Sequence, residues 1–405
     1  MKPPVRIARL GEVCQINPRL PRSPDIDDAQ EVAFVPMAAV DELTGSICKR
    51  QMRPYGEVRK GFTPFAENDV LFAKITPCME NGKVAIARDL PGGRGFGSTE
   101  FHVLRASEAV LPEWVYYFVR QKRFRNVARR SMTGTAGQQR VPTAHMAAAT
   151  IPVPDLAQQR RVVDALGSAD SIVDLRRRAR AHTEKVSLAW LARMFGDPAG
   201  NPKGWPLVEL GELLEGIDSG KSPRCLDRRK VEHEWGVLRL SALKNSLYDE
   251  TEHKTLPPGV EPDMRHEVRT GDLLLSRKNT PELVGTPAFV WHTDGRILLP
   301  DLIFRLRPRS DAGLHPVYLW ALLRAPAMRR QLQLMASGTA ASMPNISKER
   351  LRKLQVMLPP IERQNAFAKR VMVLRAIAVQ QDAALLESTA LFESLQEKHL
   401  NEPVG

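Results

Sequence analysis

The pattern of hydrophobic and polar positions changes twice along this chain, and each change opens a long helical run. Residues 156–195 contain no proline and one glycine, and residues 361–399 contain neither. At 1.5 Å per residue, each run of roughly 39 residues would form a helix about 58 Å long. Helices of this length are uncommon in globular domains and are typical of coiled coils.

The second run carries a heptad seam, in which apolar positions alternate spacings of four and three. The seam comprises Phe367, Val371, Leu374, Ala378, Gln381, Leu385, Ser388, Phe392 and Leu395. A weaker seam in the first run comprises Ala165, Ser168, Ile172, Leu175, Ala179, His182, Val186 and Ala189. Exposed seams of this length would favour aggregation, so we expect the two helices to pack on each other. The packing residues would include Ile172, Leu175, Val186, Phe367, Val371, Leu374, Leu385 and Phe392. The alternative is that each helix packs separately on its own domain.

The segments that precede the long runs mix short strands with turns. Strand-like runs occupy residues 32–40, 70–75, 235–240 and 273–276. One further helix is expected in each segment, over residues 112–132 and 316–335, and each opens on a proline that suits a first helical turn. A Gly-Thr loop and a proline then close each segment.

The chain repeats itself at a separation that drifts only from 200 to 205 residues. The repeated features keep their order although most identities differ, which indicates an internal duplication. The matched features are Leu10-Gly11-Glu12 with Leu210-Gly211-Glu212, Asn68–Leu71 with Gly271–Leu274, Thr76-Pro77 with Thr280-Pro281, Gly82 with Gly285, Pro112 with Pro316, Gly134–Ala136 with Gly338–Ala340, Pro154 with Pro359, and Gln159 with Gln364.

The duplication predicts an α+β fold with two mixed α/β domains and two long helices. We expect the first domain over 1–154 and its helix over 155–196. The second domain would span 197–360, and residues 361–405 would form the second helix and a C-terminal tail. The segment from Gly196 to Pro206 is rich in proline and glycine and would act as a linker.

The net positive charge of the chain indicates which class of molecule it could bind. The chain has 59 Lys and Arg against 46 Asp and Glu, a formal net charge of +13, and its pI is about 9.8. Such an excess favours a polyanionic partner, because neutralising phosphates releases counterions. The alternative is an ordinary basic protein with no nucleic-acid partner.

Targeting and cysteine patterns exclude several classes. No run of about eighteen apolar residues predicts a membrane span, and the first ten residues lack the apolar core of a secretory signal. We therefore expect a cytoplasmic protein without a membrane partner. The cysteines Cys14, Cys48, Cys78 and Cys225 form no C-x-x-C pair, so neither a disulfide framework nor a zinc site is expected.

The sequence has none of the motifs that a catalytic centre of the methyltransferase, ATPase or nuclease type would require. The Asn/Asp-Pro pairs at residues 17, 197 and 201 lack the second proline that an adenine methyltransferase uses to hold a flipped base. The run Gly216–Ser222 has three residues between its glycines, whereas a phosphate loop needs four, so we interpret it as a basic surface loop. The acidic pair Asp249 and Glu252 with Lys254 is a common chance pattern, and no helical histidine pair indicates a metal. We expect neither a catalytic centre nor a metal site.

Basic and amide side chains gather at corresponding places in the two copies. Arginine can bind guanine and glutamine can bind adenine in a major groove, so these positions predict DNA contacts. The alternative for each is a solvated side chain. The candidates in copy one are Lys74, Thr76, Lys83, Arg123, Gly134, Thr135, Gln138, Gln139 and Arg140, and those in copy two are Lys221, Ser222, Arg277, Lys278, Asn279, Gly338, Thr339, Ser342 and Asn345.

Taken in order, these segments resemble the specificity subunit of type I restriction–modification systems over essentially the whole chain. The resemblance rests on the order of the motifs, duplicated, rather than on any single one. Its segments are Arg9–Glu12 with Leu210–Glu212, Asn68–Phe72, the two Gly-Thr loops, the helix openings Ile151–Gln159 and Leu358–Gln364, and Met194–Pro198 leading to Asn201–Pro206.

The resemblance implies two target-recognition domains separated by two antiparallel helices. Each domain would read one half of a split double-stranded DNA target, and the helices would set the spacing and dock two modification subunits. S-adenosylmethionine, ATP and Mg²⁺ would bind to the modification and restriction subunits, and no cofactor to this chain. Two alternatives stay open, a fused restriction–methylation enzyme and a coiled-coil scaffold without DNA specificity.

Overall fold

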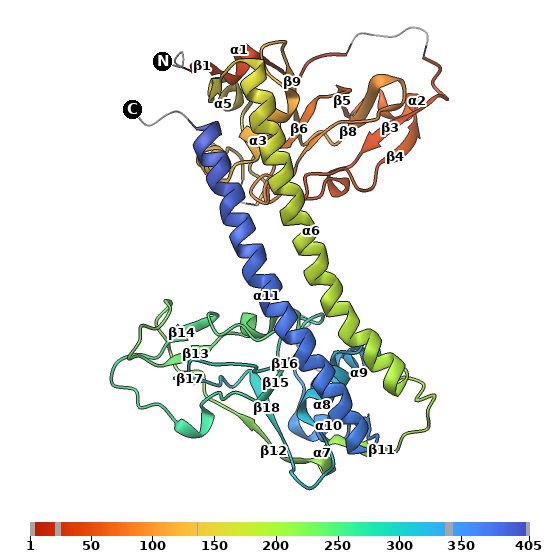
Figure 1. Cartoon of the computed structure of the whole chain (residues 1–405), viewed down its shortest axis with the longest axis vertical. Helices are drawn as coiled ribbons and strands as arrows, with labels where there is room; N and C mark the ends of the chain where they lie inside the picture. The colour runs from red at the N-terminus through yellow and green to blue at the C-terminus, as the bar shows by residue number, and fades with distance from the viewer. Residues whose placement is uncertain (1–4, 21–25, 136, 337–342, 402–405) are drawn as a thin grey trace. The chain divides into compact units, whose positions relative to one another are not determined.

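A computed structural model describes residues 5–20, 26–135, 137–336 and 343–401. The chain divides into two compact units (Figure 1): residues 1–179 with 381–405 form unit 1, and residues 180–380 form unit 2. The two long helices are confirmed as α6 (Leu156–Phe195) and α11 (Ile361–Leu400). The division falls near the middle of both, so each unit contains one half of each long helix.

Unit 1 contains two four-stranded sheets and a two-stranded one. The first sheet is antiparallel, in the order β2-β9-β6-β7, and the second has the order β4-β3-β8-β5 with β3 and β8 parallel. A separate antiparallel pair joins β1 to β10. The strands are β1 (Arg6–Arg9), β2 (Cys14–Ile16), β3 (Glu31–Val35), β4 (Gln51–Pro54), β5 (Thr63–Ala66), β6 (Val70–Ala73), β7 (Val84–Ile86), β8 (Arg94–Gly97), β9 (Phe101–Ala106) and β10 (Thr150–Val153).

Short helices cover this framework. The core of unit 1 joins strand residues such as Phe72 and Leu104 to Trp114 on α3, and it extends to Leu166 on α6 and Leu400 on α11. The long helices are therefore part of this core. The other helical segments are α1 (Leu10–Val13), α2 (Tyr55–Val58), α3 (Pro112–Arg120), α4 (Lys122–Arg130), α5 (Thr143–Ala148) and the 3-10 turns η1 (Met37–Ala39) and η2 (Pro91–Gly93).

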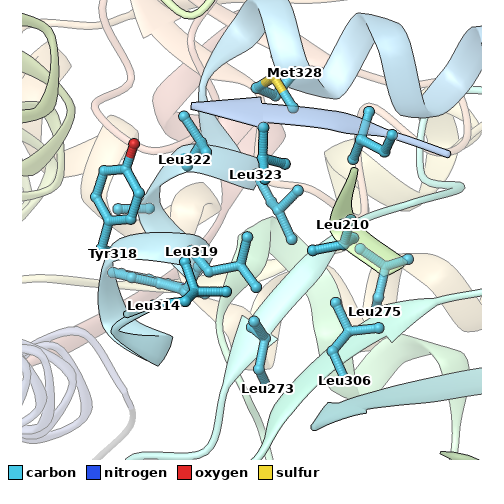
Figure 2. Packing of buried hydrophobic residues seen from close by; sticks show 14 of the residues in the cluster. Leu210, Leu273, Leu275, Leu306, Leu314, Tyr318, Leu319, Leu322, Leu323 and Met328 are labelled. Atoms are coloured by element: carbon cyan, nitrogen blue, oxygen red, sulfur yellow. The ribbon is translucent and has the colours of Figure 1, made fainter. Parts of the chain in front are cut away.

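Unit 2 repeats part of this plan. Its antiparallel sheet has the order β12-β18-β15-β16, a second sheet has the order β14-β13-β17, and β11 pairs with β19. Leucines of α8 and of strands β15 and β18 meet in one apolar cluster, as Figure 2 shows. The elements are β11 (Leu207–Glu209), α7 (Leu210–Leu213), β12 (Leu214–Ser219), β13 (Gly236–Leu238), η3 (Leu240–Ser246), β14 (His253–Thr255), η4 (Met264–His266), β15 (Leu273–Ser276), β16 (Pro287–Phe289), β17 (Ile297–Leu298), β18 (Ile303–Pro308), α8 (Pro316–Arg324), α9 (Pro326–Met335), α10 (Lys348–Arg352) and β19 (Gln355–Met357).

The single helix predicted before each Gly-Thr loop is wrong, because each is broken into two. Gln121 separates α3 from α4 and Ala325 separates α8 from α9, and both residues have an extended backbone (ψ 138° and 139°). Pro326 explains the second break, since proline disfavours a helical conformation in the residue before it. At the first break, the buried Gln121 amide donates to the Phe118 carbonyl (3.3 Å) and covers the end of α3.

The halves of α6 and α11 pack antiparallel within each unit. In unit 1, Arg176 donates to Ser388 Oγ and to the Ala384 carbonyl, whereas the earlier Leu166 shares a cluster with the later Leu400. In unit 2, the rings of Phe195 and Phe367 lie 5.6 Å apart, and the guanidinium of the later Arg370 lies 5.9 Å from the ring centroid of the earlier Trp190. Residues later in α6 therefore contact residues earlier in α11, so the two helices run antiparallel.

The predicted seam of α6 requires a correction. Ile172 and Leu175 are 47% and 64% exposed, so they do not pack between the helices. The buried stripe lies one residue further along, at Val162, Leu166, Ala169, Val173, Ser187 and Leu191. The half-buried Arg176 and Arg180 continue it with heptad spacing, and a search for apolar residues passes over them.

The other predicted packing residues are buried or half-buried. On α11, Phe367, Val371 and Ala378 are buried, and Leu374, Leu385 and Phe392 are half-buried, as is Val186 on α6. Within the described ranges, no helix combines the length and the apolar character that a membrane crossing requires.

Candidate nucleic-acid interface

In unit 1, the turn after β6 is hydrogen-bonded to the end of the Gly-Thr loop. The Thr76 amide donates to the Gln139 carbonyl (3.0 Å), and the Gln139 amide donates to Thr76 Oγ1 (3.2 Å). The Val141 amide donates to the Lys74 carbonyl (2.9 Å). Segments more than sixty residues apart thus meet, and four candidates, Lys74, Thr76, Gln139 and Arg140, lie together.

Arg140 forms a two-pronged ion pair with Glu100, at the start of β9. Its Nε donates to Oε2 (2.9 Å) and its Nη2 donates to Oε1 (2.7 Å). The side chains of Arg140 and Glu100 are 41% and 24% exposed. Hydrogen bonds from Arg140, with the nearby charge of Lys74, hold the pKa of Glu100 below its ordinary value, so the carboxylate stays ionised.

The apex of the same loop is exposed. Gly134, Thr135 and Gln138 all lie at the surface, and the Gln138 amide donates to the Thr135 carbonyl (3.0 Å). Gly134 has φ 126°, a backbone conformation that favours glycine. These candidates are placed where a ligand can reach them.

Lys83 is placed differently from what its sequence position suggested. Its ammonium group donates to the carbonyls of Val40 (2.9 Å) and Met37 (3.4 Å), so it ties the β6–β7 turn to the neighbouring segment. Neighbouring Gly82 has φ 84°, and a side chain there would lie 3.0 Å from the Arg125 guanidinium. We therefore assign Lys83 to the scaffold rather than to the contact surface.

Helix α4 presents a basic face beside this turn. Phe124 and Ala128 are buried, whereas the cations on the other faces, Lys122, Arg123, Arg129 and Arg130, are exposed. Arg129 pairs with Glu80 in the β6–β7 turn (2.9 Å). This ion pair joins the helix to the turn.

Unit 2 joins the corresponding segments. The Ile346 amide donates to the Arg277 carbonyl (2.9 Å), and Lys278 and Asn345 form a β-bridge. Arg277 Nε donates to Asn345 Oδ1 (3.1 Å), and Asn279 Oδ1 accepts from the following amide, that of Thr280 (2.9 Å). The candidates Gly338, Thr339 and Ser342 lie outside the described residues.

A buried aromatic ring, that of Phe304, lies beneath this surface in unit 2. The guanidinium of Arg277 lies 5.4 Å from the Phe304 ring centroid, and the ammonium of Lys348 lies 5.9 Å from it. Sequence reasoning missed Lys348 and Phe304, because both are brought to Arg277 only by the fold. Glu100 was missed for the same reason, since forty residues separate it from Arg140.

The loop after β12 reaches the same part of unit 2. Ser222 Oγ donates to the Asp301 carboxylate, and the Asp301 carbonyl accepts from Arg277 Nη1 (3.4 Å). Lys221 is exposed beside it. Gly216 lies within strand β12, which agrees with a surface loop at 220–222 and not with a phosphate loop.

The acidic residues considered as a nuclease centre take separate partners. Asp249 accepts from the Thr251 side chain (2.8 Å), Glu252 from Ser241 (2.5 Å), and Lys254 lies 3.5 Å from Asp227. Across the part of the chain that the structure describes, no group of three or more His, Cys, Asp or Glu residues is arranged to hold a metal ion.

The sequence of this chain is similar to a known protein family and to individual known proteins. A family model described as the type I restriction modification DNA specificity domain matches residues 4–184. The EcoEI type I restriction enzyme specificity subunit of Escherichia coli is 27% identical over 444 residues, which cover 87% of this chain and 74% of that protein. The EcoAI specificity subunit of the same species is 36% identical over 155 residues, 38% of this chain and 26% of that protein.

Solved structures share the fold. A chain from a study of complex assembly and conformational transition of a type I restriction–modification system aligns with a TM-score of 0.54 at 24% identity, covering 98% of both chains. The S subunit from M. genitalium aligns with a TM-score of 0.55 at 12% identity, covering 98% of this chain and 96% of that one. Residues 4–184 thus match the type I restriction modification DNA specificity domain, and 87% of the chain is similar to a type I specificity subunit.

Proposed function

We propose that this chain reads a split DNA target, with one recognition domain for each half, and that it has no catalytic centre of its own. The main support for this proposal is a hydrogen-bonded junction with the end of the Gly-Thr loop. It involves the turn after β6 in unit 1 and the turn after β15 in unit 2. Each unit has this junction, and each junction presents basic and amide side chains. Such side chains supply both phosphate contacts and base-edge contacts.

An internal duplication accounts for the two junctions. The order β2-β9-β6-β7 in unit 1 matches β12-β18-β15-β16 in unit 2. The helices agree as well, since the Trp114 indole donates to the Pro152 carbonyl (2.9 Å) and the Tyr318 hydroxyl donates to the Met357 carbonyl (3.0 Å). The side chains that face the junctions differ between the units, so the two half-targets would differ in sequence.

The long helices would form a coiled coil and dock two modification subunits. A second heptad series on α11 is solvent-exposed and apolar: Met372, Ala376, Val379, Ala383, Leu386 and Ala390. The exposed Ile172 and Leu175 belong to a similar series on α6. Apolar heptad stripes left in solvent fit helices of a partner. S-adenosylmethionine would then bind to those modification subunits, and ATP and Mg²⁺ to restriction subunits.

The test is the methylome of a host that expresses the full chain with its cognate modification subunit. The proposal predicts adenine methylation at one split motif, and no methylation when either protein is expressed alone. Methylation by this chain alone would instead indicate a fused enzyme. A co-purifying complex that leaves the methylome unchanged, and whose affinity for random duplex DNA has no steep salt dependence, would indicate a scaffold.

A further inference from the structure

Arg140 is the best-held cation of the unit 1 junction. Its Nε and Nη2 each donate a hydrogen bond to the Glu100 carboxylate, and its Nη1 donates to the Gln138 carbonyl (3.0 Å). A guanidinium carries five N–H groups, so one N–H on each terminal nitrogen stays available. The side chain is 41% exposed. Arg140 therefore presents two donors to solvent from a fixed position.

Two donors in this arrangement match one base. Guanine presents its O6 and N7 acceptors side by side in the major groove, and a guanidinium binds both. Because Glu100 already fixes the rotamer, Arg140 would lose little side-chain entropy when it binds. A merely solvated arginine would not have this advantage.

The paired carboxylate argues against a phosphate contact. Glu100 is ionised and 24% exposed, so its charge offsets that of Arg140 at the surface. A DNA phosphate placed against Arg140 would be repelled by Glu100, whereas an uncharged base edge would not. The exposed cations of α4 are better suited to phosphates.

The corresponding place in unit 2 has different chemistry. The Lys74 amide donates to the Glu100 carbonyl (2.9 Å), and the Arg277 amide donates to the Leu302 carbonyl (2.9 Å), so Leu302 corresponds to Glu100. The β-bridges of Ile75 with Arg140 and of Lys278 with Asn345 make Asn345 the counterpart of Arg140. At this position, unit 2 has neither the arginine nor its carboxylate.

We propose that Arg140 reads a guanine in the half-target of the first domain, and that Glu100 is the positioning residue that holds it in place. This inference rests on the proposed function above, and it adds a base and a residue pair to it. Unit 2, with Asn345 and Leu302, would not read guanine by this means.

The test compares methylomes of complexes that contain the full chain and its modification subunit. In the wild type, one half-target should contain a G·C pair that Arg140→Ala relaxes, with discrimination at that pair falling roughly tenfold to hundredfold. Arg140→Lys should restore it only in part, because an ammonium group cannot make the paired hydrogen bonds to Glu100 that hold the side chain in place. Glu100→Gln should relax the same pair several-fold, and adding it to Arg140→Ala should produce no further change. The other half-target should stay intact in every variant.

A matched control is the exposed pair Arg59–Asp28 (2.9 Å), whose arginine is 42% exposed. Arg59→Ala should leave the motif unchanged. An unchanged motif in a methylating Arg140→Ala complex would overturn the inference. So would a Glu100→Gln complex that binds all DNA more tightly with its motif intact, because that result indicates a phosphate contact. If the melting temperature shows that Arg140→Ala does not fold, the Glu100→Gln complex tests the inference alone. An unchanged motif in that complex would then overturn the inference. A wild-type complex without a split motif contradicts the proposed function itself.

Discussion

Gln159 and Gln364 make the same three hydrogen bonds in the two units. Oε1 accepts from the Leu111 amide (2.9 Å) in unit 1 and from the His315 amide (2.8 Å) in unit 2. Nε2 donates to two carbonyls, those of Ala109 and Pro154 in unit 1 and those of Gly313 and Pro359 in unit 2. Both side chains are fully buried. Each glutamine thus ties the start of a long helix to the loop before α3 or α8.

We expect Gln159→Ala and Gln364→Ala to destabilise their units by similar amounts. Each substitution would leave one buried carbonyl, one part-buried carbonyl and a part-buried backbone amide without their partner, at a cost of about 2–3 kcal/mol. Chemical denaturation of the full chain measures the effect. Replacing the exposed Gln380 in the same way is the control, and it should change the unfolding free energy by less than about 0.5 kcal/mol. Equal effects of Gln380→Ala and Gln364→Ala would contradict this account.

Glu184 on α6 forms an ion pair with Arg324, a buried arginine at the end of α8. Arg324 is 8% exposed, lies 4.3 Å from the Trp320 ring centroid, and donates to Glu184 (2.8 Å). We expect Glu184→Ala to destabilise unit 2 by about 2–4 kcal/mol, because it leaves a buried charge without its counterion. Asp174→Ala on the same helix breaks the surface pair with Arg178, whose arginine is 72% exposed, and should cost under about 1 kcal/mol. A Glu184→Ala variant as stable as Asp174→Ala would refute this role.

The contribution of Glu184 should depend on pH. Burial acts to raise the pKa of Glu184, but hydrogen bonds from Arg180 and Arg324 outweigh it and hold the pKa below the ordinary value of 4.5. A lowered pKa in the folded state stabilises the fold above the unfolded-state pKa, and this contribution is lost as the pH falls through the folded-state value. The stabilities of wild type and Glu184→Gln should therefore converge as the pH falls below 4.5, the ordinary glutamate pKa, and through the lowered pKa of the folded state. A difference that grows on acidification would contradict the assignment.

Two adjacent leucines on α11 allow helix packing and the proposed docking of modification subunits to be tested separately. Leu386 is 72% exposed, whereas the neighbouring Leu385 is half-buried. We expect Leu386→Glu to leave the melting temperature unchanged but to weaken assembly with modification subunits, as measured by native mass spectrometry. Leu385→Glu should lower the melting temperature of the chain itself. Full assembly by Leu386→Glu would show that the exposed stripe is not the docking surface.

The sequence predicted the long helices well because proline and glycine are so sparse in them. Both observed helices match the expected ranges to within one residue. The α6 seam was placed one residue off, because Arg176 and Arg180 occupy seam positions and bury long side chains among polar partners. Hydrophobicity alone does not reveal an arginine that is buried by its hydrogen bonds.

The candidate surface was predicted in part. Local sequence pointed to Lys74, Thr76, Gln139 and Arg140, and the fold brings these together. Lys83 has the same local signature, yet its ammonium group binds backbone carbonyls. Glu100 had no signal at all, because its importance comes from a contact across forty residues that its counterpart Leu302 does not share.

Exchange of one domain tests the central claim most directly. Residues 1–154 would be replaced by the first domain of another specificity subunit, and the methylome of the chimera with the modification subunit would be sequenced. The account predicts that one half of the methylated motif changes to that of the donor and that the other half is retained. A motif that changes in both halves, or in neither, would contradict the assignment of one half-target to each domain.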